Sequence, residues 1–220
     1  MNYWKQMSSG RYVDLADVRP EDVRLDDITT SLSRISRFSG HAMHGVEPLT
    51  VAQHSLMVCD ITKDLTDDPV AVLAAVSHDF EEAYTGDIIT PVKRMLKDTS
   101  FITDIESSIK KQLMPDFDID SHNQVVKYAD LVSLHLEREI LFGLDEKHDH
   151  KWPVRPYKTG NYNAVEMYHK YRSKTAGHLK KEFMNAYTSA RISQGVTPEA
   201  VRHVGSDSGS PVLFTVVSSS

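Results

Sequence analysis

The chain has 220 residues, of which 40% are hydrophobic and 25% charged, and these proportions are typical of a globular protein with its own core. With 25 basic and 31 acidic residues the formal net charge is −6, which argues against broad binding to nucleic-acid polymers but allows a local basic pocket for one phosphate-bearing ligand. Cys59 is the only cysteine, no apolar run is long enough to span a membrane, and the first residues lack a signal-peptide core, so we expect a cytoplasmic protein without disulfides or a membrane partner.

The N-terminal region predicts a small β-hairpin. The segments "NYWKQ" and "RYVDL" are short, aromatic and partly alternating, and "MSSG" lies between them. Beyond them, Asp27 is expected to cap a helix that continues far enough to place Arg34 and Arg37 on one face.

The central region predicts two helices that lead into an acidic stretch. Thr50 can cap the helix that begins "VAQHSLM", and Pro69 lies at or near the first position of the next helix. That second helix carries "VAVLAAV" directly into "HDFEEAYTGD" at residues 78–87. A buried carboxylate is costly unless it finds a partner, a proton or a metal, so this stretch requires one of the three.

The C-terminal half predicts further helices at roughly 99–113 and 122–143, and another over much of 162–190. After residue 195 the content of Gly, Ser and Pro rises, and "PVLFTVV" near the end reads as a docked arm or an edge strand. We therefore expect an all-α fold with one domain over 1–195, a small N-terminal hairpin, and a flexible or docked tail over 196–220.

Four side chains stand out as candidate metal ligands: His54, the adjacent pair His78 and Asp79, and Asp130. Each lies in a predicted helix that is otherwise apolar on one side, and imidazole with carboxylate suits a divalent transition metal. The spacings of 24 and 51 residues are not diagnostic, and a lone histidine is more often a structural residue. The Asp within "KYADLVSLHL" is harder to explain structurally, because it carries both a helix-propensity cost and a desolvation cost.

The segments "VAQHS", "SHDFEEAYTGDIITPVK" and "KYADLVS" together resemble the H…HD…D signature of the HD-domain phosphohydrolases. The resemblance covers roughly residues 3–140 and is closest to the branch that contains bacterial 5′-deoxynucleotidases and phage deoxynucleoside triphosphohydrolases. The segments "SGR" and "LSRISRFSGH" resemble phage and prophage members. The resemblance implies an HD-domain helical bundle, and a host cytoplasmic location for a phage-encoded chain.

The resemblance also implies roles for individual residues. It implies that one divalent transition metal, Co²⁺, Mn²⁺ or Zn²⁺, is held by four ligands: His54, His78, Asp79 and Asp130. Mg²⁺ would arrive with the substrate phosphates. Glu82 matches the carboxylate that positions or deprotonates the attacking water, and on a continuous helix it would share a face with His78. Asp87 matches a second acid near the site.

The substrate contacts implied by the resemblance are less complete. Arg37 and Phe38 align with an Arg–Trp pair that contacts phosphate and packs against the sugar, although the aromatic residue here is Phe. Lys93 either reaches a phosphate or is a solvated lysine at a helix start. Glu81 is expected to be an ordinary surface acid, and His41 and His44 border the predicted entrance loop.

Two reactions fit these residues. The phage-like segments favour a dNTP triphosphohydrolase specific for dATP, which releases deoxynucleoside and triphosphate. The alternative is a 5′-deoxynucleotidase that hydrolyses dNMPs, and a degenerate HD domain that only binds nucleotides is a third reading. In each case the expected partner is a small-molecule nucleotide, without a nucleic-acid polymer or membrane, and the relatives imply a homo-oligomer.

Overall fold

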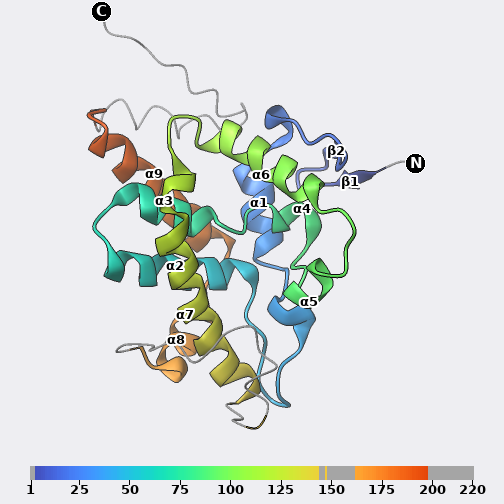
Figure 1. Ribbon diagram of the computed structural model, residues 1–220, viewed down its shortest axis with the longest axis vertical. Helices are drawn as coiled ribbons and strands as arrows, with labels where there is room; N and C mark the ends of the chain where they lie inside the picture. Colours follow the sequence, from blue (N-terminus) through green and yellow to red (C-terminus); the bar gives the residue numbers. More distant parts are fainter. Residues whose placement is uncertain (1–2, 144–146, 148–161, 198–220) are drawn as a thin grey trace, which may run out of the picture.

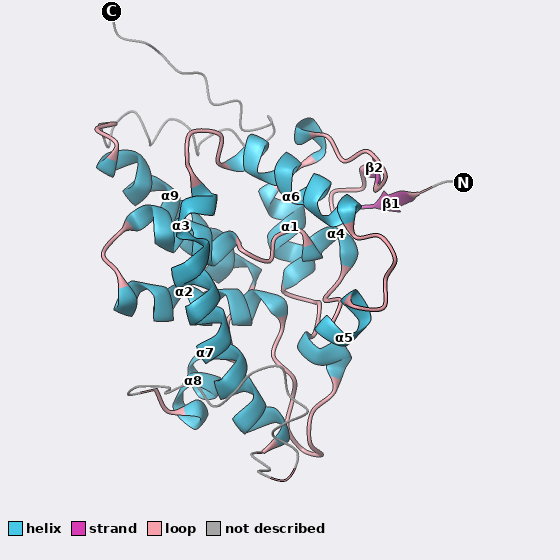
Figure 2. Ribbon diagram, viewed as in Figure 1, coloured by secondary structure: helices cyan, strands magenta, loops and turns pink. Residues whose placement is uncertain are grey.

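Helices make up most of the molecule, and a single two-stranded hairpin is the only sheet in the part of the chain described (Figures 1 and 2). The computed structural model describes residues 3–143, 147 and 162–197. The predicted all-α fold with an N-terminal hairpin is confirmed. The expected tail over 196–220, apart from its first two residues, and its "PVLFTVV" segment lie outside the described residues.

The hairpin consists of β1 (Trp4–Gln6) and β2 (Tyr12–Asp14), which are antiparallel with Lys5 opposite Val13. The Lys5 ammonium donates hydrogen bonds of 2.9 Å to the backbone carbonyls of Ala83 and Tyr84 in α4 (Glu82–Thr85). The hairpin therefore fixes α4 from outside, as its position beside α4 in Figure 1 illustrates.

Helix α1 (Leu25–Leu32) differs from the prediction at both ends. Asp27 is not its N-cap. Its buried carboxylate instead accepts hydrogen bonds from the backbone N–H and hydroxyl of Ser9, at 2.6 and 2.7 Å. The helix ends at Leu32, a turn follows, and Ser36 then bridges to Thr50, so Arg34 and Arg37 do not share a helical face. Arg37 instead begins the short 3₁₀ helix η2 (Arg37–Gly40).

The centre of the core is formed by four helices: α2 (Val51–Leu65), α3 (Pro69–Ser77), α7 (Asn123–Phe142) and α9 (Ala176–Ser193). Helix α2 packs against α3 and α7, while α3 packs against α9. Both predicted helix starts are confirmed: Thr50 accepts a hydrogen bond from the Gln53 backbone N–H, and Pro69 is the first residue of α3. Fully buried apolar side chains of these helices form part of the core, among them Val58, Ile61, Leu73, Leu136 and Ala190.

The other elements cover this core: η1 (Pro20–Asp22), α5 (Thr90–Lys93), α6 (Ser100–Leu113), η3 (Ile119–His122) and α8 (Ala164–Tyr171). The predicted helices at 99–113 and 122–143 are confirmed as α6 and α7 within a residue. The prediction of one helix over 162–190 is wrong, because this region forms two separate helices, α8 and α9. The Gln53 amide donates to the carbonyls of Arg172 and Lys174, and these bonds fix the turn between them. None of the helices in the described ranges is long and apolar enough to cross a membrane.

Candidate metal and phosphate site

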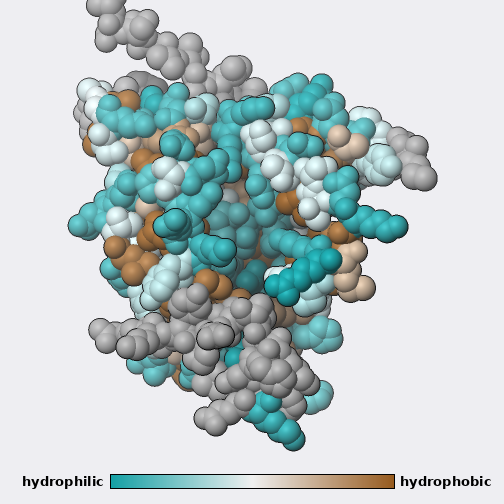
Figure 3. All heavy atoms as spheres, in the orientation of Figure 1, coloured by the Kyte–Doolittle hydropathy of each residue, from teal (hydrophilic) through white to brown (hydrophobic). Residues whose placement is uncertain are grey.

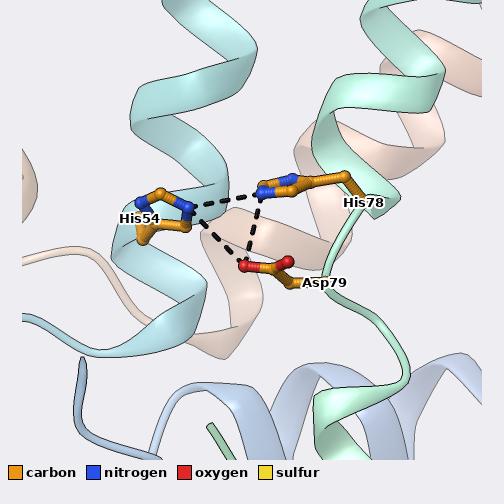
Figure 4. A group of neighbouring side chains, drawn as sticks. All are labelled: His54, His78 and Asp79. Atoms are coloured by element: carbon orange, nitrogen blue, oxygen red, sulfur yellow. Dashed lines mark hydrogen bonds and ion pairs between the residues drawn. The ribbon is translucent and has the colours of Figure 1, made fainter. Parts of the chain in front are cut away.

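The four candidate metal ligands come together from two helices and from the turn that follows a third, so the expectation that each lies within a helix is wrong for His78 and Asp79. His54 lies in the middle of α2 and is fully buried, Asp130 lies within α7, and His78 and Asp79 follow the last residue of α3. Figure 4 shows the side chains of His54, His78 and Asp79 pointing toward one another. The potential ligand atoms of these three residues all lie within 4.8 Å of one another, and Asp130 approaches the group through His54 Nε2.

The separations of the donor atoms fit a shared cation. His78 Nε2 is 3.3 Å from His54 Nε2 and 3.2 Å from Asp79 Oδ2. His54 Nε2 is 3.5 Å from Asp79 Oδ2 and 3.2 Å from Asp130 Oδ1. Donor atoms that share a cation at about 2.1 Å lie about 3.0–3.4 Å from one another, which is close to the observed spacing.

Hydrogen bonds on the far sides of both imidazole rings support the same conclusion. His54 Nδ1 lies 2.7 Å from Glu137 Oε1, and His78 Nδ1 lies 2.7 Å from the Ala75 carbonyl oxygen. Both acceptors require a proton on Nδ1, so in the neutral rings the two Nε2 lone pairs face each other. This arrangement is repulsive unless positive charge lies between them, and orienting contacts of this kind are typical of metal-binding histidines.

The electrostatics of the metal-free site show how strongly it attracts positive charge. Burial lowers the pKa of His78, but the adjacent Asp79 carboxylate outweighs it and raises that pKa to about 10. The pKa of Asp79 is lowered despite its burial, because His78, His54 and Arg37 surround it. Without a metal the site therefore holds a proton, and a divalent cation supplies the same compensation.

Glu82 does not lie on one helix with His78, as the sequence had suggested. Helix α3 ends at Ser77, a turn follows, and Glu82 is the first residue of α4. Its carboxylate is only 3% exposed, and Oε2 has no hydrogen-bond partner in the described structure. Burial, followed by the charges of Asp79 and Asp87, raises the pKa of Glu82 to about 9 in the metal-free protein.

The expectation that Glu81 is a surface acid is wrong. Its side chain is 6% exposed, and burial raises its pKa to about 8, followed by the charges of Asp79 and Glu106. The turn after α3 directs Glu81 toward α6, where it lines a separate cavity of 220 Å³ with His78, Glu106 and Lys110. Glu81 and Glu82 are therefore both buried, but Glu81 is absent from the lining of the larger pocket on which Glu82 opens.

A pocket of 440 Å³ adjoins the candidate ligands and contains most of the predicted site. Its polar lining comprises Arg37, His41, Asp79, Glu82, Asp87, Thr90, Lys93 and Asp130. Its apolar lining comprises Phe38, Ile88, Ile89, Pro91, Leu134 and Phe142. His54 and His78 do not line it, and neither does His44. Figure 3 shows a hollow bordered by hydrophilic residues near the middle of the face viewed.

The positive charge in this pocket comes from Arg37 and Lys93. Arg37 is almost buried, with Nη1 at 3.8 Å from both Asp79 Oδ2 and Asp87 Oδ1. Although burial lowers the pKa of Arg37, the surrounding carboxylates outweigh it and raise the pKa, so the guanidinium stays charged. Lys93 Nζ lies 3.9 Å from Glu82 Oε1. Lys93 therefore lines the pocket, and its contact with a phosphate stays a prediction.

Phe38 has an unusual backbone conformation, with φ of +53°, and Ser39 follows it at +54°. A bulky residue in this region is strained, and such strain is concentrated at functional sites. Here the conformation lets the Phe38 backbone N–H donate to Asp87 Oδ2 at 3.0 Å. The Phe38 ring meets the Phe142 ring edge to face, with centroids 5.2 Å apart, and forms an aromatic wall beside the charged groups.

Sequence reasoning missed Glu137, which is fully buried behind His54. It lies seven residues after Asp130, two turns along α7 and on the same face. An acidic residue at this spacing, within the apolar run of a predicted helix, was the available signal.

Comparison with known proteins gives a family match over the region that carries these residues. A family model described as "5′-deoxynucleotidase YfbR-like" matches residues 27–141. The chain is 34% identical over 149 residues to the uncharacterized protein YfdR of Escherichia coli K12, covering 66% of this chain and 75% of that protein. It is 32% identical over 148 residues to an uncharacterized protein of Rhodobacter capsulatus, covering 65% and 75% of the two chains.

Proposed function

Since the chain belongs to the YfbR-like 5′-deoxynucleotidase family, whose members are HD-domain, metal-dependent phosphohydrolases acting on deoxynucleotides, we propose that it hydrolyses deoxynucleoside monophosphates. The reaction would take place in the 440 Å³ pocket. The family supports this alternative better than the dATP triphosphohydrolase that the phage-like segments had favoured, which stays a prediction.

The observation that carries the proposal is the pair of facing imidazole nitrogens, 3.3 Å apart, beside two carboxylates. We propose that one divalent transition metal is bound by His54, His78, Asp79 and Asp130. When bound, such a cation lowers the pKa of a coordinated water and polarises a phosphoryl oxygen. The donor set has no thiolate, which fits Mn²⁺, Co²⁺ or Zn²⁺.

Glu82 is proposed to accept the proton of the attacking water. Its Oε2 is buried and free of hydrogen bonds within the described residues, and the side chain opens onto the pocket beside Asp79. The high pKa of this carboxyl in the metal-free protein gives it a strong affinity for a proton. With a divalent cation held by the four ligands, the charges of Asp79 and Asp87 would be offset, and the pKa of Glu82 would fall toward the range of a general base.

Arg37 and Lys93 are proposed to bind the phosphate, since both cationic side chains line the pocket. Asp87 then acts by position: it accepts the Phe38 N–H and lies 3.8 Å from the Arg37 guanidinium. Phe38 and the nearby apolar lining provide the surface for the sugar and base.

The proposal is tested by incubating the purified protein with each dNMP and each dNTP in the presence of Co²⁺ or Mn²⁺. We expect release of inorganic phosphate from dNMPs and little product from dNTPs. Release of triphosphate from dATP without hydrolysis of any dNMP would instead establish the triphosphohydrolase. A protein that binds neither metal and remains inert would support the degenerate nucleotide-binding module.

A further inference from the structure

The buried carboxylate of Glu137 contacts one candidate metal ligand, His54, and one candidate phosphate-binding side chain, Arg37. Its Oε1 lies 2.7 Å from His54 Nδ1, and its Oε2 accepts a hydrogen bond from Arg37 Nε at 3.4 Å. Ser133, one turn earlier on α7, places its hydroxyl 3.4 Å from the same Oε1 and 3.2 Å from His54 Nδ1. Each oxygen of one carboxylate thus serves a different functional side chain.

The two partners of Glu137 face different parts of the site. His54 presents its other nitrogen, Nε2, to His78, Asp79 and Asp130. Arg37 extends its Nη1 toward Asp79 and Asp87 at the pocket. A carboxylate that accepts from Nδ1 keeps the His54 tautomer in which Nε2 is free to bind a metal.

A purely structural ion pair would explain the burial of Glu137 but not this division of its oxygens. In a bidentate ion pair, both oxygens of the Glu137 carboxylate would accept hydrogen bonds from the Arg37 guanidinium, and this would be enough to compensate the buried charge. Instead Arg37 donates through Nε alone, and its Nη1 atom remains directed toward the pocket side. The carboxylate therefore sets the direction of the guanidinium as well as the tautomer of the imidazole.

We propose that Glu137 is a positioning residue that couples the metal site to the phosphate site, by holding His54 for metal binding and Arg37 for phosphate binding at the same time. This inference rests on the proposed function for the roles of His54 and Arg37. It goes beyond that function by making the two affinities depend on one side chain that touches neither ligand.

The decisive variant is Glu137→Gln, which keeps the shape of the side chain but has only one acceptor oxygen. Because His54 Nδ1 and Arg37 Nε are both donors, the amide group must leave one of them facing another N–H group. The matched control is Glu139→Gln, the same change two residues later on the exposed side of α7.

Two dissociation constants are measured by calorimetry, and neither requires turnover. The first is that of Co²⁺ for the metal-free protein, and the second is that of inorganic phosphate for the Co²⁺-saturated protein. In Glu137→Gln we expect Co²⁺ binding to weaken by about 10–100-fold, as for other partners of metal-binding histidines. We expect phosphate binding to weaken by about tenfold or more, whereas Glu139→Gln leaves both constants unchanged.

Loss of only one of the two affinities would overturn the coupling, and loss of neither, with a lower melting temperature, would leave Glu137 as a structural ion pair. If Glu137→Gln does not fold, Glu137→Asp tests the same point, because it retains the charge but is too short to span His54 and Arg37. A wild-type protein that hydrolyses no deoxynucleotide would refute the proposed function, yet the contrast between the two glutamine variants would still decide this inference.

Discussion

Replacing Glu82 with glutamine is expected to lower kcat strongly while the divalent metal stays bound. The variant preserves the size and polarity of the side chain but removes its ability to accept a proton. A positioned general base contributes about 10²–10⁴-fold to the rate. At 1.36 kcal/mol for each factor of ten, this corresponds to about 3–5 kcal/mol of transition-state stabilisation.

The structure also predicts the opposite effect of this change on stability. The pKa of Glu82 is raised from 4.5 to about 9 in the metal-free folded protein, so the folded state holds its proton more tightly than the unfolded state. The corresponding stabilisation is complete below the unfolded pKa and is lost as the pH rises toward 9. Glu82→Gln never has to ionise, so in the metal-free form at pH 8–9 it should be more stable than the wild type.

The assay combines steady-state hydrolysis of a dNMP, Co²⁺ binding by calorimetry, and urea denaturation of the metal-free protein. Glu81→Gln is the matched control, because the neighbouring carboxyl is also buried but lines the separate cavity beside α6. This control should keep kcat within the same order of magnitude. The reasoning is refuted if Glu82→Gln retains wild-type kcat, or if Glu81→Gln loses as much activity as Glu82→Gln.

Three further predictions concern the metal, the pH and the core. Asp130→Asn should weaken Co²⁺ binding at least about tenfold in calorimetry, because it removes an anionic ligand; an unchanged affinity would exclude Asp130 from the site. The metal-free protein should lose stability between pH 6.5 and 10 as His78, whose pKa is raised to about 10, gives up its proton; a flat urea-denaturation profile would contradict this. Leu73→Ala, at a fully buried position, should cost about 2–5 kcal/mol in the same assay, whereas Leu65→Ala at a 45% exposed position should cost far less; equal losses would place the core elsewhere.

The sequence alone determined that the chain is mostly helical and where α2 and α3 begin. The apolar periodicity, Thr50 as a cap and Pro69 at a first helical position depend on residues within a few positions of one another, and the structure confirms them. It also indicated the HD-type family, because the motifs around His54, His78 and Asp130 are local segments. The family match over residues 27–141 confirms that family.

Only the tertiary structure decided how the charges around the site are compensated. Glu137 is 83 residues from His54 and 100 residues from Arg37 along the chain, so no local pattern could pair them. Glu81 was expected to be a surface acid, but the turn after Ser77 buries it against α6. Burial and charge pairing depend on which distant segments pack together. Helix propensity and capping depend on neighbours in the sequence, which is why the elements were predictable and the partners of their buried charges were not.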